Sequence, residues 1–299
     1  MINNLRRRFI IFNILVISTI IIIVGLVMFV GSPRHIPRDI SPHRYLITFF
    51  LGIVLVFIGS WLLSKKAVEP IEKAWQKQLD FTADASHELR TPIAVIQTNL
   101  ELVLDSPTET VASQMKWLKN IEAENNRMAQ LVGDLLTLSR ADTNEQVLEV
   151  EPLVLNEIIS ETLTAFEPIA TEKKIELKTQ FADELIFNGD RKRMKQLFAI
   201  LIDNALAYMN RSGTITIDLQ DVEKEIILTV TDTGYGIDSD HLDKIFDRFY
   251  RVSKTRTLKQ EGAGLGLAIA KWIVTEHGGA IYVESILDVG TTFTIRLPK

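Results

Sequence analysis

The sequence predicts a membrane-anchored protein of several domains, with two transmembrane helices, an antiparallel helical hairpin and a C-terminal α/β domain. Three observations lead to this prediction. The chain has 299 residues, of which 24% are charged, yet residues 1–63 contain only six arginines and one aspartate as charged side chains. Apolar residues then recur at heptad spacing in two successive stretches. From about residue 150, segments with the periodicity of strands alternate with segments with the periodicity of helices.

Two uncharged runs, residues 9–30 and 45–63, are long enough for transmembrane helices, which need about 18 or more apolar residues. A secretory signal peptide is the alternative for the first run, but its apolar region would span only about 7–15 residues. Residues 31–44, with three prolines, would form a short extracytoplasmic loop. Seven basic side chains lie close before the first run and after the second, against three in the loop, so residues 1–8 and the C-terminal part are expected to be cytoplasmic.

Composition excludes several classes of protein. The chain has no cysteine, so disulfide frameworks, thiolate catalysis and cysteine-ligated metal sites are ruled out. The net charge is −5 although the first 63 residues are basic, so the remainder is strongly acidic. An acidic surface does not attract a phosphate backbone, and we therefore expect no nucleic acid as a partner.

Residues 64–142 are expected to form a juxtamembrane helix followed by a helical hairpin. The first heptad seam consists of Leu89, Ile93, Ile96, Leu100 and Val103. After a break at Asp-Ser-Pro (residues 105–107), the second seam consists of Leu118, Ile121, Asn125, Met128, Val132 and Leu135. Two helices joined by a short turn lie antiparallel but bury little apolar surface alone, so a homodimer that forms a four-helix bundle is expected.

One histidine stands out on the first hairpin helix. His87 lies two residues before Leu89, about 200° around the helix, so its side chain should face solvent. Thr91 lies one turn further on the same face, and Pro92 should kink the helix. The adjacent Glu88 can accept the imidazole proton and leave the other ring nitrogen nucleophilic, although a lone surface histidine can equally be inert.

Residues 81–92, Phe-Thr-Ala-Asp-Ala-Ser-His-Glu-Leu-Arg-Thr-Pro, resemble the H-box of sensor histidine kinases from two-component systems. The resemblance implies that His87 is the phosphoacceptor and that Glu88 is the acid–base group that assists its phosphorylation. Thr91 would position water for dephosphorylation of the partner protein, which is the receiver domain of a response regulator.

Residues 150–299 are expected to form one α/β domain with mostly antiparallel strands. The expected strands are residues 175–179, 185–187, 214–219, 225–231, 280–284 and 292–297. The expected helices are residues 156–171, 190–209 and 265–277, with Asn156 as a candidate N-cap. Two glycine clusters, at residues 232–237 and 262–267, let a ligand approach the backbone, but each alone is equally consistent with a turn. The second cluster lacks Rossmann spacing, and the chain has no Walker phosphate loop.

In this order after an H-box, these segments resemble the ATP-binding domain of histidine kinases, which is shared in outline with gyrase and Hsp90-type ATPases. Residues 201–208 resemble the N-box, so the resemblance implies that Asn204 binds Mg²⁺ that bridges the ATP phosphates. Asp232 would accept a hydrogen bond from the adenine amino group, and residues 246–251 resemble the F-box. The other residues implied to bind the nucleotide are Tyr208, Gly234, Gly236, Phe249, Arg251, Gly262, Gly264, Gly266, Leu267 and Thr291.

The same resemblance assigns a mobile lid to residues 252–261, with Phe249 as its anchor and Arg251 near the phosphates. Two positions depart from the family pattern, because Ile200 replaces an asparagine and Ala207 replaces a lysine that reaches a phosphate. The loss of one oxygen ligand and one cation is expected to weaken Mg²⁺–ATP binding or to slow transfer. Activity is expected to persist, because Mg²⁺ keeps several water ligands and can be bound by few protein ligands.

The resemblance therefore predicts a multi-pass sensor kinase of the bacterial plasma membrane. It would autophosphorylate His87 from ATP and pass the phosphoryl group to an aspartate of a response regulator. One alternative is a protein that acts mainly as a phosphatase of the regulator, through Thr91, and another is a degenerate sensor without catalysis. A gyrase- or chaperone-type function fits less well, since neither needs a transmembrane histidine hairpin.

The signal is expected to arise in or at the membrane. The loop of residues 31–44 has no room for a folded ligand domain, so a membrane lipid or a membrane protein is a candidate signal. Its arginines and histidines can equally be solvated flanking charges. Residues 64–87 are too few for a long relay domain, so the second span is expected to continue into the His87 helix, with Pro70 as a hinge.

Overall fold

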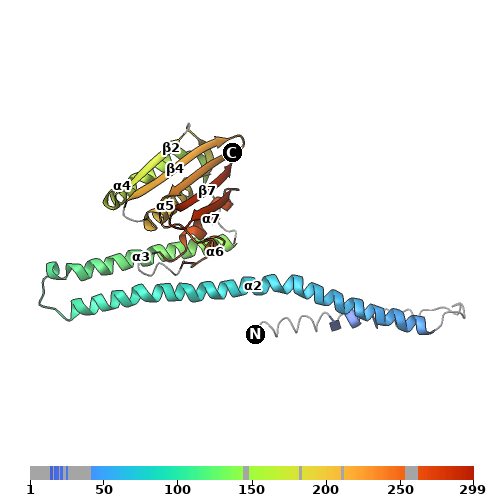
Figure 1. Cartoon of the computed structure of the whole chain (residues 1–299). Coiled ribbons are helices and arrows are strands. Elements are labelled where there is room, and N and C mark those ends of the chain that lie inside the picture. Colours follow the sequence, from blue (N-terminus) through green and yellow to red (C-terminus); the bar gives the residue numbers. More distant parts are fainter. Residues whose placement is uncertain are drawn as a thin grey trace. The chain divides into compact units, whose positions relative to one another are not determined.

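A computed structural model describes residues 42–143, 148–181, 184–209, 212–252 and 262–299, with eight further residues between positions 14 and 25. The chain divides into two units, Met1–Ala83 and Asp84–Lys299. Helix α2 (Pro42–Leu104) begins in the first unit and ends in the second (Figure 1).

The first unit holds the segments expected to cross the membrane. Most of the predicted span at residues 9–30, and the loop up to residue 41, lie outside the described residues. The predicted span at residues 45–63 lies within α2, which stays helical through Pro70. Among the residues that the structure describes, no helix combines the length and the apolar character of a membrane span. Large apolar side chains such as Phe57 and Trp61 are nevertheless more than half exposed there.

The second unit begins with the predicted hairpin. Helix α2 ends at Leu104, and α3 (Val111–Thr143) follows, so the helix break expected at residues 105–107 is confirmed. Polar side chains tie the two helices together. The Asn120 amide donates to Asn99 Oδ1 over 3.2 Å, and the Gln114 amide donates to the carbonyl oxygens of Val103 and Ser106 over 3.1 and 2.9 Å.

The seams of the hairpin are only partly covered within one chain. Ile93, Leu100 and Val132 are each more than 40% exposed, whereas Leu131 and Leu138 of α3 are buried against the C-terminal domain. Helix α3 packs on helix α7 (Gly266–Glu276) of that domain. A single hairpin therefore leaves an apolar stripe for which the described part of the chain provides no cover.

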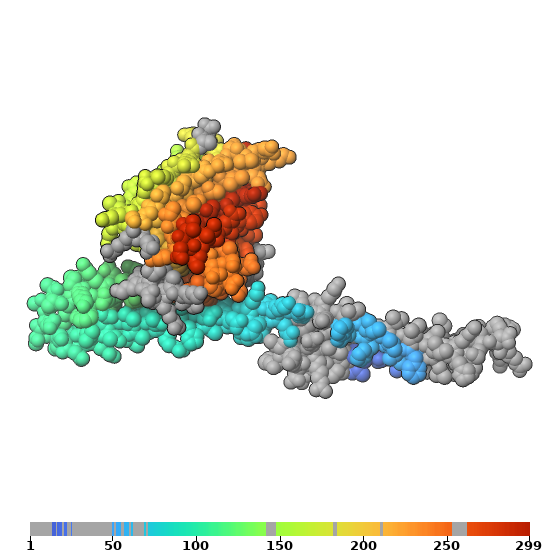
Figure 2. Space-filling model, viewed as in Figure 1, coloured from blue at the N-terminus to red at the C-terminus, as the bar shows by residue number. Residues whose placement is uncertain are grey.

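The C-terminal domain is a two-layer α/β sandwich, as expected. Its sheet contains, in spatial order, β2 (Ile175–Phe181), β4 (Gly213–Val222), β5 (Glu225–Asp232), β7 (Gly290–Pro298) and β6 (Ala280–Ile286). Only β2 and β4 pair in parallel. A separate antiparallel pair, β1 (Val150–Val154) and β3 (Ile186–Asp190), was not expected as such, because β1 has no prediction. Strands β4 to β7 form one outer face, in orange and red in Figure 2.

Three helices, α4 (Leu155–Lys173), α5 (Arg191–Ala207) and α7, pack against one another and against the sheet. Each was predicted within a few residues. The Asp190 side chain caps α5 by accepting a hydrogen bond from the Arg193 N–H over 3.0 Å. The prediction for Asn156 was wrong, because Val154 is the N-cap residue of α4. Asn156 instead accepts a hydrogen bond from the Leu185 N–H, which attaches α4 to the start of β3.

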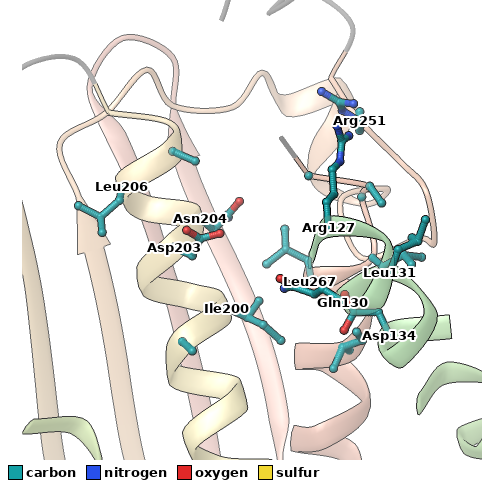
Figure 3. Close-up of a pocket in the computed structure, with 18 of the residues that line it drawn as sticks. Arg127, Gln130, Leu131, Asp134, Ile200, Asp203, Asn204, Leu206, Arg251 and Leu267 are labelled. Carbon is teal, nitrogen blue, oxygen red and sulfur yellow. The ribbon is translucent and has the colours of Figure 1, made fainter. Parts of the chain in front are cut away.

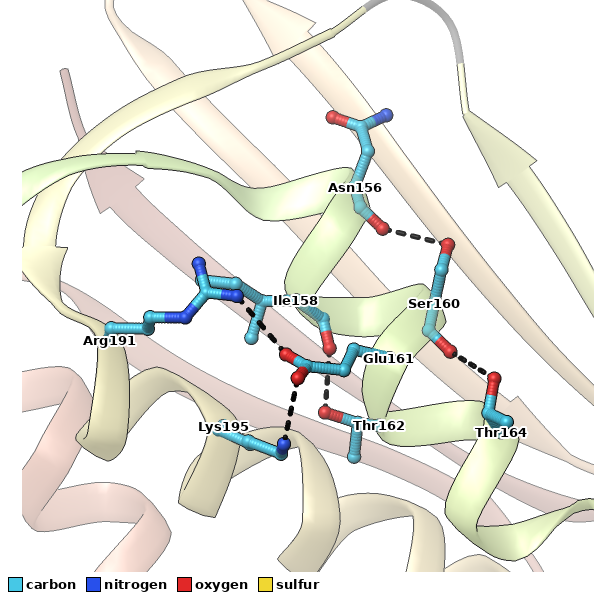
Figure 4. Close-up of polar contacts among 8 residues, drawn as sticks. All are labelled: Asn156, Ile158, Ser160, Glu161, Thr162, Thr164, Arg191 and Lys195. Atoms are coloured by element: carbon cyan, nitrogen blue, oxygen red, sulfur yellow. Dashed lines mark hydrogen bonds and ion pairs between the residues drawn. The ribbon is translucent and has the colours of Figure 1, made fainter.

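A charged cluster on the surface joins α4 to the first turns of α5 (Figure 4). One carboxylate oxygen of Glu161 lies 3.1 Å from the Arg191 guanidinium, and the other lies 3.3 Å from the Lys195 ammonium. The hydrogen bond and charge of Lys195, followed by Arg191, lower the pKa of Glu161. Exposed ion pairs stabilise little, so this cluster contributes little to the stability of the domain.

Candidate nucleotide-binding site

Helix α5 places the predicted metal ligand at the edge of the core. One face of α5 is buried, and it includes Met194, Leu197, Leu201 and Leu206. Asn204 lies off this face, half-buried, and lines a cavity of about 730 Å³. The amphipathic pattern of the helix therefore presents an amide side chain to a space large enough for a ligand of drug-like size.

The cavity brings together many of the residues that the resemblance to histidine kinases implies to be functional. Predicted residues along its wall are Glu88, Asn204, Tyr208, Arg251, Gly262, Gly264, Gly266 and Leu267. Figure 3 shows several of them with the facing side chains of α3. The departures from the family pattern, Ile200 and Ala207, also line it. The N-box, the end of the F-box and the second glycine cluster thus share one space, although more than 40 residues separate the first from the others along the chain.

Asp232 stands at the end of β5, where it continues the core-facing side of the strand. It follows Ile226, Leu228 and Val230 in alternation and is only 6% exposed. Its Oδ1 accepts a hydrogen bond from the Gly234 N–H over 2.8 Å. Burial raises the pKa of Asp232, and the backbone N–H groups of Gly234 and Thr291 counteract that rise. A carboxylate in this position has acceptor capacity for a ligand that donates a hydrogen bond.

Thr291 belongs with Asp232 because the two residues are directly opposite in the β5–β7 register. Thr291 is also 6% exposed, and its hydroxyl lies 2.9 Å from the Ser285 hydroxyl. Neither Asp232 nor Thr291 lines the 730 Å³ cavity, and the same holds for Gly234, Gly236 and Phe249. The predicted nucleotide residues therefore fall into two groups, one around Asn204 and one around Asp232.

Backbone contacts hold these two groups together. The Tyr235 N–H donates to the Tyr208 carbonyl oxygen over 3.1 Å, which joins the first glycine cluster to the end of α5. A Cβ at Gly234 would lie 2.5 Å from that same carbonyl oxygen, so only glycine allows this approach. Tyr208 faces the cavity of the first group, and its partner Tyr235 lies three residues beyond Asp232.

The second glycine cluster is attached to the F-box in a similar way. The Phe249 N–H donates to the Gly264 carbonyl oxygen over 2.9 Å. Gly264 has a φ of +73°, and a Cβ there would meet the backbone of Phe249 and Tyr250 at 2.9 Å. The Tyr250 hydroxyl lies 2.6 Å from His241 Nδ1 of α6 (Ser239–Leu242). Of the predicted lid, residues 253–261 lie outside the described residues.

His87 is exposed on α2, as predicted from its helical position, and so is Thr91. Helix α2 continues through Pro92, which is buried and lines the cavity together with Glu88. The histidine itself does not line the cavity. Glu88 and Pro92 are therefore the H-box residues that line the candidate site, and the carboxylate among them is that of Glu88.

Sequence reasoning missed the contribution of α3 to this cavity. Arg127, Gln130 and Asp134 line it from the second hairpin helix. Burial raises the pKa of Asp134 to about 6, against an ordinary value near 4 for an aspartate. No local motif marks these residues, since only the packing of α3 on the C-terminal domain brings them to the site. Their spacing of three or four residues, which places them on one helical face, was the available signal.

The donor set can be compared with what Mg²⁺ and nucleotide phosphates require. Within the described residues there is no cluster of three or more histidine or acidic side chains arranged for a metal ion. Mg²⁺ keeps several water ligands and is commonly bound through substrate phosphates plus one or two protein oxygens. The Asn204 amide, with the nearby glycine backbone of residues 262–266, fits that kind of site.

The arrangement defines a class of protein in which a helical hairpin with an exposed histidine precedes a nucleotide-binding α/β sandwich. Residues 77–144 match the His Kinase A (phospho-acceptor) domain, and residues 189–299 match the histidine kinase-, DNA gyrase B- and HSP90-like ATPase family. The chain belongs to the sensor histidine kinases of two-component systems, with both of these domains. The family membership expected from residues 81–92 and from the C-terminal motifs is confirmed.

Curated relatives support this membership. The chain is 36% identical over 253 residues to the sensor histidine kinase RppB of Synechocystis sp., covering 84% of this chain and 56% of the relative. It is 36% identical over 224 residues to the sensor protein SrrB of Staphylococcus aureus, covering 75% of this chain and 38% of the relative. The chain thus spans about half the length, or less, of these relatives.

Solved structures show the same fold. The histidine kinase AdeS of Acinetobacter baumannii superposes with a TM-score of 0.58 at 28% identity, over 71% of this chain and 97% of that one. The histidine kinase ThkA, solved in complex with the response regulator protein TrrA, gives a TM-score of 0.60 at 26% identity, over 76% of this chain and 64% of that one.

Proposed function

We propose that this protein autophosphorylates His87 from ATP and then transfers the phosphoryl group to an aspartate of a response regulator. The observation that carries the proposal is the position of Glu88, which lines the same cavity as Asn204 and the second glycine cluster while the adjacent His87 is exposed. The phosphoacceptor segment and the candidate phosphate-binding residues therefore meet in one site.

The chemistry follows from the roles that these side chains can play. A ring nitrogen of His87 attacks the γ-phosphorus, the bond from phosphorus to the bridging oxygen breaks, and ADP leaves. Glu88 accepts the proton from the other ring nitrogen, which keeps the phosphorylated imidazole from carrying an extra charge. Asn204 would hold Mg²⁺, which would supply charge neutralisation at the phosphates. Arg251 adds a second positive charge at the same end of the site.

The adenine end is assigned to Asp232. Its buried carboxylate suits a hydrogen bond from the adenine amino group, and Thr291 lies beside it across the β5–β7 pair. The group around Asn204 would hold the phosphates, and the Tyr208–Tyr235 backbone contact keeps the two ends in register. Ile200 and Ala207 provide no oxygen ligand and no cation, so binding weaker than in relatives that keep those groups is expected.

Replacing His87 with glutamine is expected to abolish phosphorylation, because glutamine has no nucleophilic ring nitrogen. The full chain in detergent, incubated with Mg²⁺ and γ-labelled ATP, should acquire a phosphoryl label that acid removes and alkali spares. The His87→Gln variant should acquire none. Thr98→Ala, an exposed change on the same helix, is the matched control and should keep the wild-type label. Label on His87→Gln, or no label on the wild type while a control kinase is active, would contradict the proposal.

We also propose a homodimer. The apolar side chains of Ile93, Leu100 and Val132 stay exposed on the hairpin, and a second hairpin would cover them in a four-helix bundle. The partner that receives the phosphoryl group is proposed to be a receiver domain, which would approach the exposed face that carries His87 and Thr91. ThkA, a structural relative, has been solved with a response regulator.

We propose further that residues 9–30 and 45–63 cross a bacterial plasma membrane, with both termini in the cytoplasm. The uncharged runs and the distribution of basic residues support this arrangement. Because the chain has no cysteine, single cysteines report topology cleanly. In intact spheroplasts, a Ser41→Cys variant should react with a membrane-impermeant maleimide, and the control Thr98→Cys should react only after lysis. Reaction of both, or of neither, before lysis would overturn the topology.

A further inference from the structure

We propose that Arg127 of α3 is a phosphate-binding residue that supplies the cation missing at position 207. The inference rests on the proposed function and adds a residue to the same site. The second hairpin helix would then contribute directly to nucleotide binding, in addition to carrying the dimer seam.

The wall of the cavity near the end of α5 has few groups that could meet a phosphate. Ala207 is apolar, and among the residues that the structure describes, the cations along the cavity are Arg127, Lys173 and Arg251. The Lys173 ammonium donates to the Leu206 carbonyl oxygen over 2.8 Å, and its charge also acts on Asp203. Lys173 is thus engaged by the C-terminal end of α5, and Arg127 is the cation that the hairpin contributes to the cavity.

The local environment leaves the Arg127 guanidinium available. The nearest carboxylate oxygen, Glu124 Oε2, lies 3.8 Å away, which is longer than a hydrogen bond. That oxygen is itself buried without a hydrogen-bond partner. The Arg127 side chain is 34% exposed, so it is neither buried in the hairpin nor fully solvated. Its donors can therefore serve a ligand in the cavity without breaking a strong ion pair.

The direction of the side chain agrees with this role. In Figure 3, Arg127 extends from α3 toward the end of the cavity where Arg251 lies. Arg251 in turn acts on the Tyr208 hydroxyl, since its charge counteracts the rise that burial causes in the pKa of Tyr208. Two guanidinium groups that line one cavity repel each other, and an anion that binds between them lowers that repulsion. A polyphosphate chain satisfies both, because each planar guanidinium can bind phosphate oxygens in a bidentate manner.

A phosphate-binding Arg127 would link the hairpin to the C-terminal domain. Asn204 and the glycine cluster belong to the C-terminal domain, whereas Arg127 and Glu88 belong to the hairpin. Phosphates bound between Asn204 and Arg127 would hold the ATPase domain on the hairpin at the level of the H-box. Nucleotide binding and presentation of His87 would then be linked through one arginine.

The test compares ligands with and without phosphates on the full chain in detergent. Binding of AMP-PNP with Mg²⁺ and binding of adenosine are measured by calorimetry for the wild type and for Arg127→Gln, Arg127→Lys and Lys119→Gln. We expect the Kd for AMP-PNP to rise about tenfold in Arg127→Gln, as for the loss of one charge-assisted hydrogen-bonded contact, with the Kd for adenosine unchanged. Arg127→Lys should recover part of the loss, and Lys119→Gln, an exposed change on α3, should show none.

Two results would overturn the proposal. An AMP-PNP affinity of Arg127→Gln equal to that of Lys119→Gln removes Arg127 from the site while leaving the kinase assignment intact. Equal losses for AMP-PNP and adenosine show a general disturbance of the domain, which melting curves of both variants would reveal. By contrast, a wild-type chain that binds no AMP-PNP and acquires no label at His87 rejects the proposed function itself.

Discussion

The Asp232→Asn variant is expected to bind ATP about 100-fold more weakly than the wild type. The carboxylate would accept a hydrogen bond from the adenine amino group, and an asparagine there presents either a neutral acceptor or a donor that faces another donor. Loss of a charge-assisted bond in a buried site costs about 2–3 kcal/mol, which corresponds to a factor of about 30–150 in Kd. Asp232 is only 6% exposed, as is Thr291 opposite it, so the lost contact would lie in a site shielded from water.

The fold should survive this change, and its stability should not fall. Asparagine keeps an oxygen that can accept the Gly234 N–H bond seen at 2.8 Å. Burial raises the pKa of Asp232, so the folded state penalises the ionised form. The associated destabilisation is absent at low pH and grows as the pH rises through the range between the unfolded and folded pKa values. A neutral side chain removes it, so the melting temperature at neutral pH should stay level or rise.

Calorimetric titration with Mg²⁺–ATP and a thermal melt on the same samples test both parts. The matched control is Asp240→Asn, which removes a carboxylate from an exposed position in α6. It should bind ATP as the wild type does. An Asp232→Asn protein that is folded and binds ATP within threefold of the wild type would show that the adenine lies elsewhere.

A second large effect is expected from Gly290→Ala at the start of β7. Gly290 has a φ of +147°, and a Cβ at this position would lie 2.0 Å from the Asp232 carbonyl oxygen, which is a backbone atom that cannot rotate away. The strand would have to shift at the very point where Thr291 pairs with Asp232. We expect a loss of about 3 kcal/mol in stability, since strain in the backbone and a steric clash both contribute.

Thermal unfolding followed by circular dichroism measures this loss. The melting temperature of the C-terminal domain should fall by about 6 °C or more. Gly133→Ala is the matched control, because no atom lies within 4 Å of the Cβ it would add and the residue sits within helix α3. Alanine favours a helix over glycine by about 1 kcal/mol, so this variant should melt at the same or a higher temperature. Equal melting temperatures for the two variants would refute the close approach of β7 to β5.

Most of the secondary structure of the C-terminal domain, with the exception of β1 and α6, was predictable because its signals are local. Alternation of apolar residues in β5 and β7, and the N-terminal signal of Asp190 before α5, identify those elements without any tertiary contact. The error at Asn156 has a physical cause. Its side chain is suited to capping, but the Leu185 N–H competes for the same oxygen, and that partner comes from a distant segment.

The residues of the candidate site also differ in this respect, because some lie in local motifs and others reach the site only through packing. Motif residues such as His87, Asn204 and Asp232 could be selected because each lies in a short pattern with a recognisable resemblance. Arg127 and Asp134 could not, since their spacing on α3 is that of any helical face and their meeting with Asn204 depends on how α3 packs against the C-terminal domain.

The family, the order of the domains and the candidate phosphoacceptor thus follow from residues close together in the sequence. Three features were decided only by tertiary structure: the pairing of Asp232 with Thr291, the contact between Tyr208 and Tyr235, and the presence of Arg127 in the cavity. The physical reason is the sequence distance over which each kind of interaction acts. Periodicity and caps are set within a few residues, whereas strand register and helix packing are set by burial that brings together segments tens of residues apart.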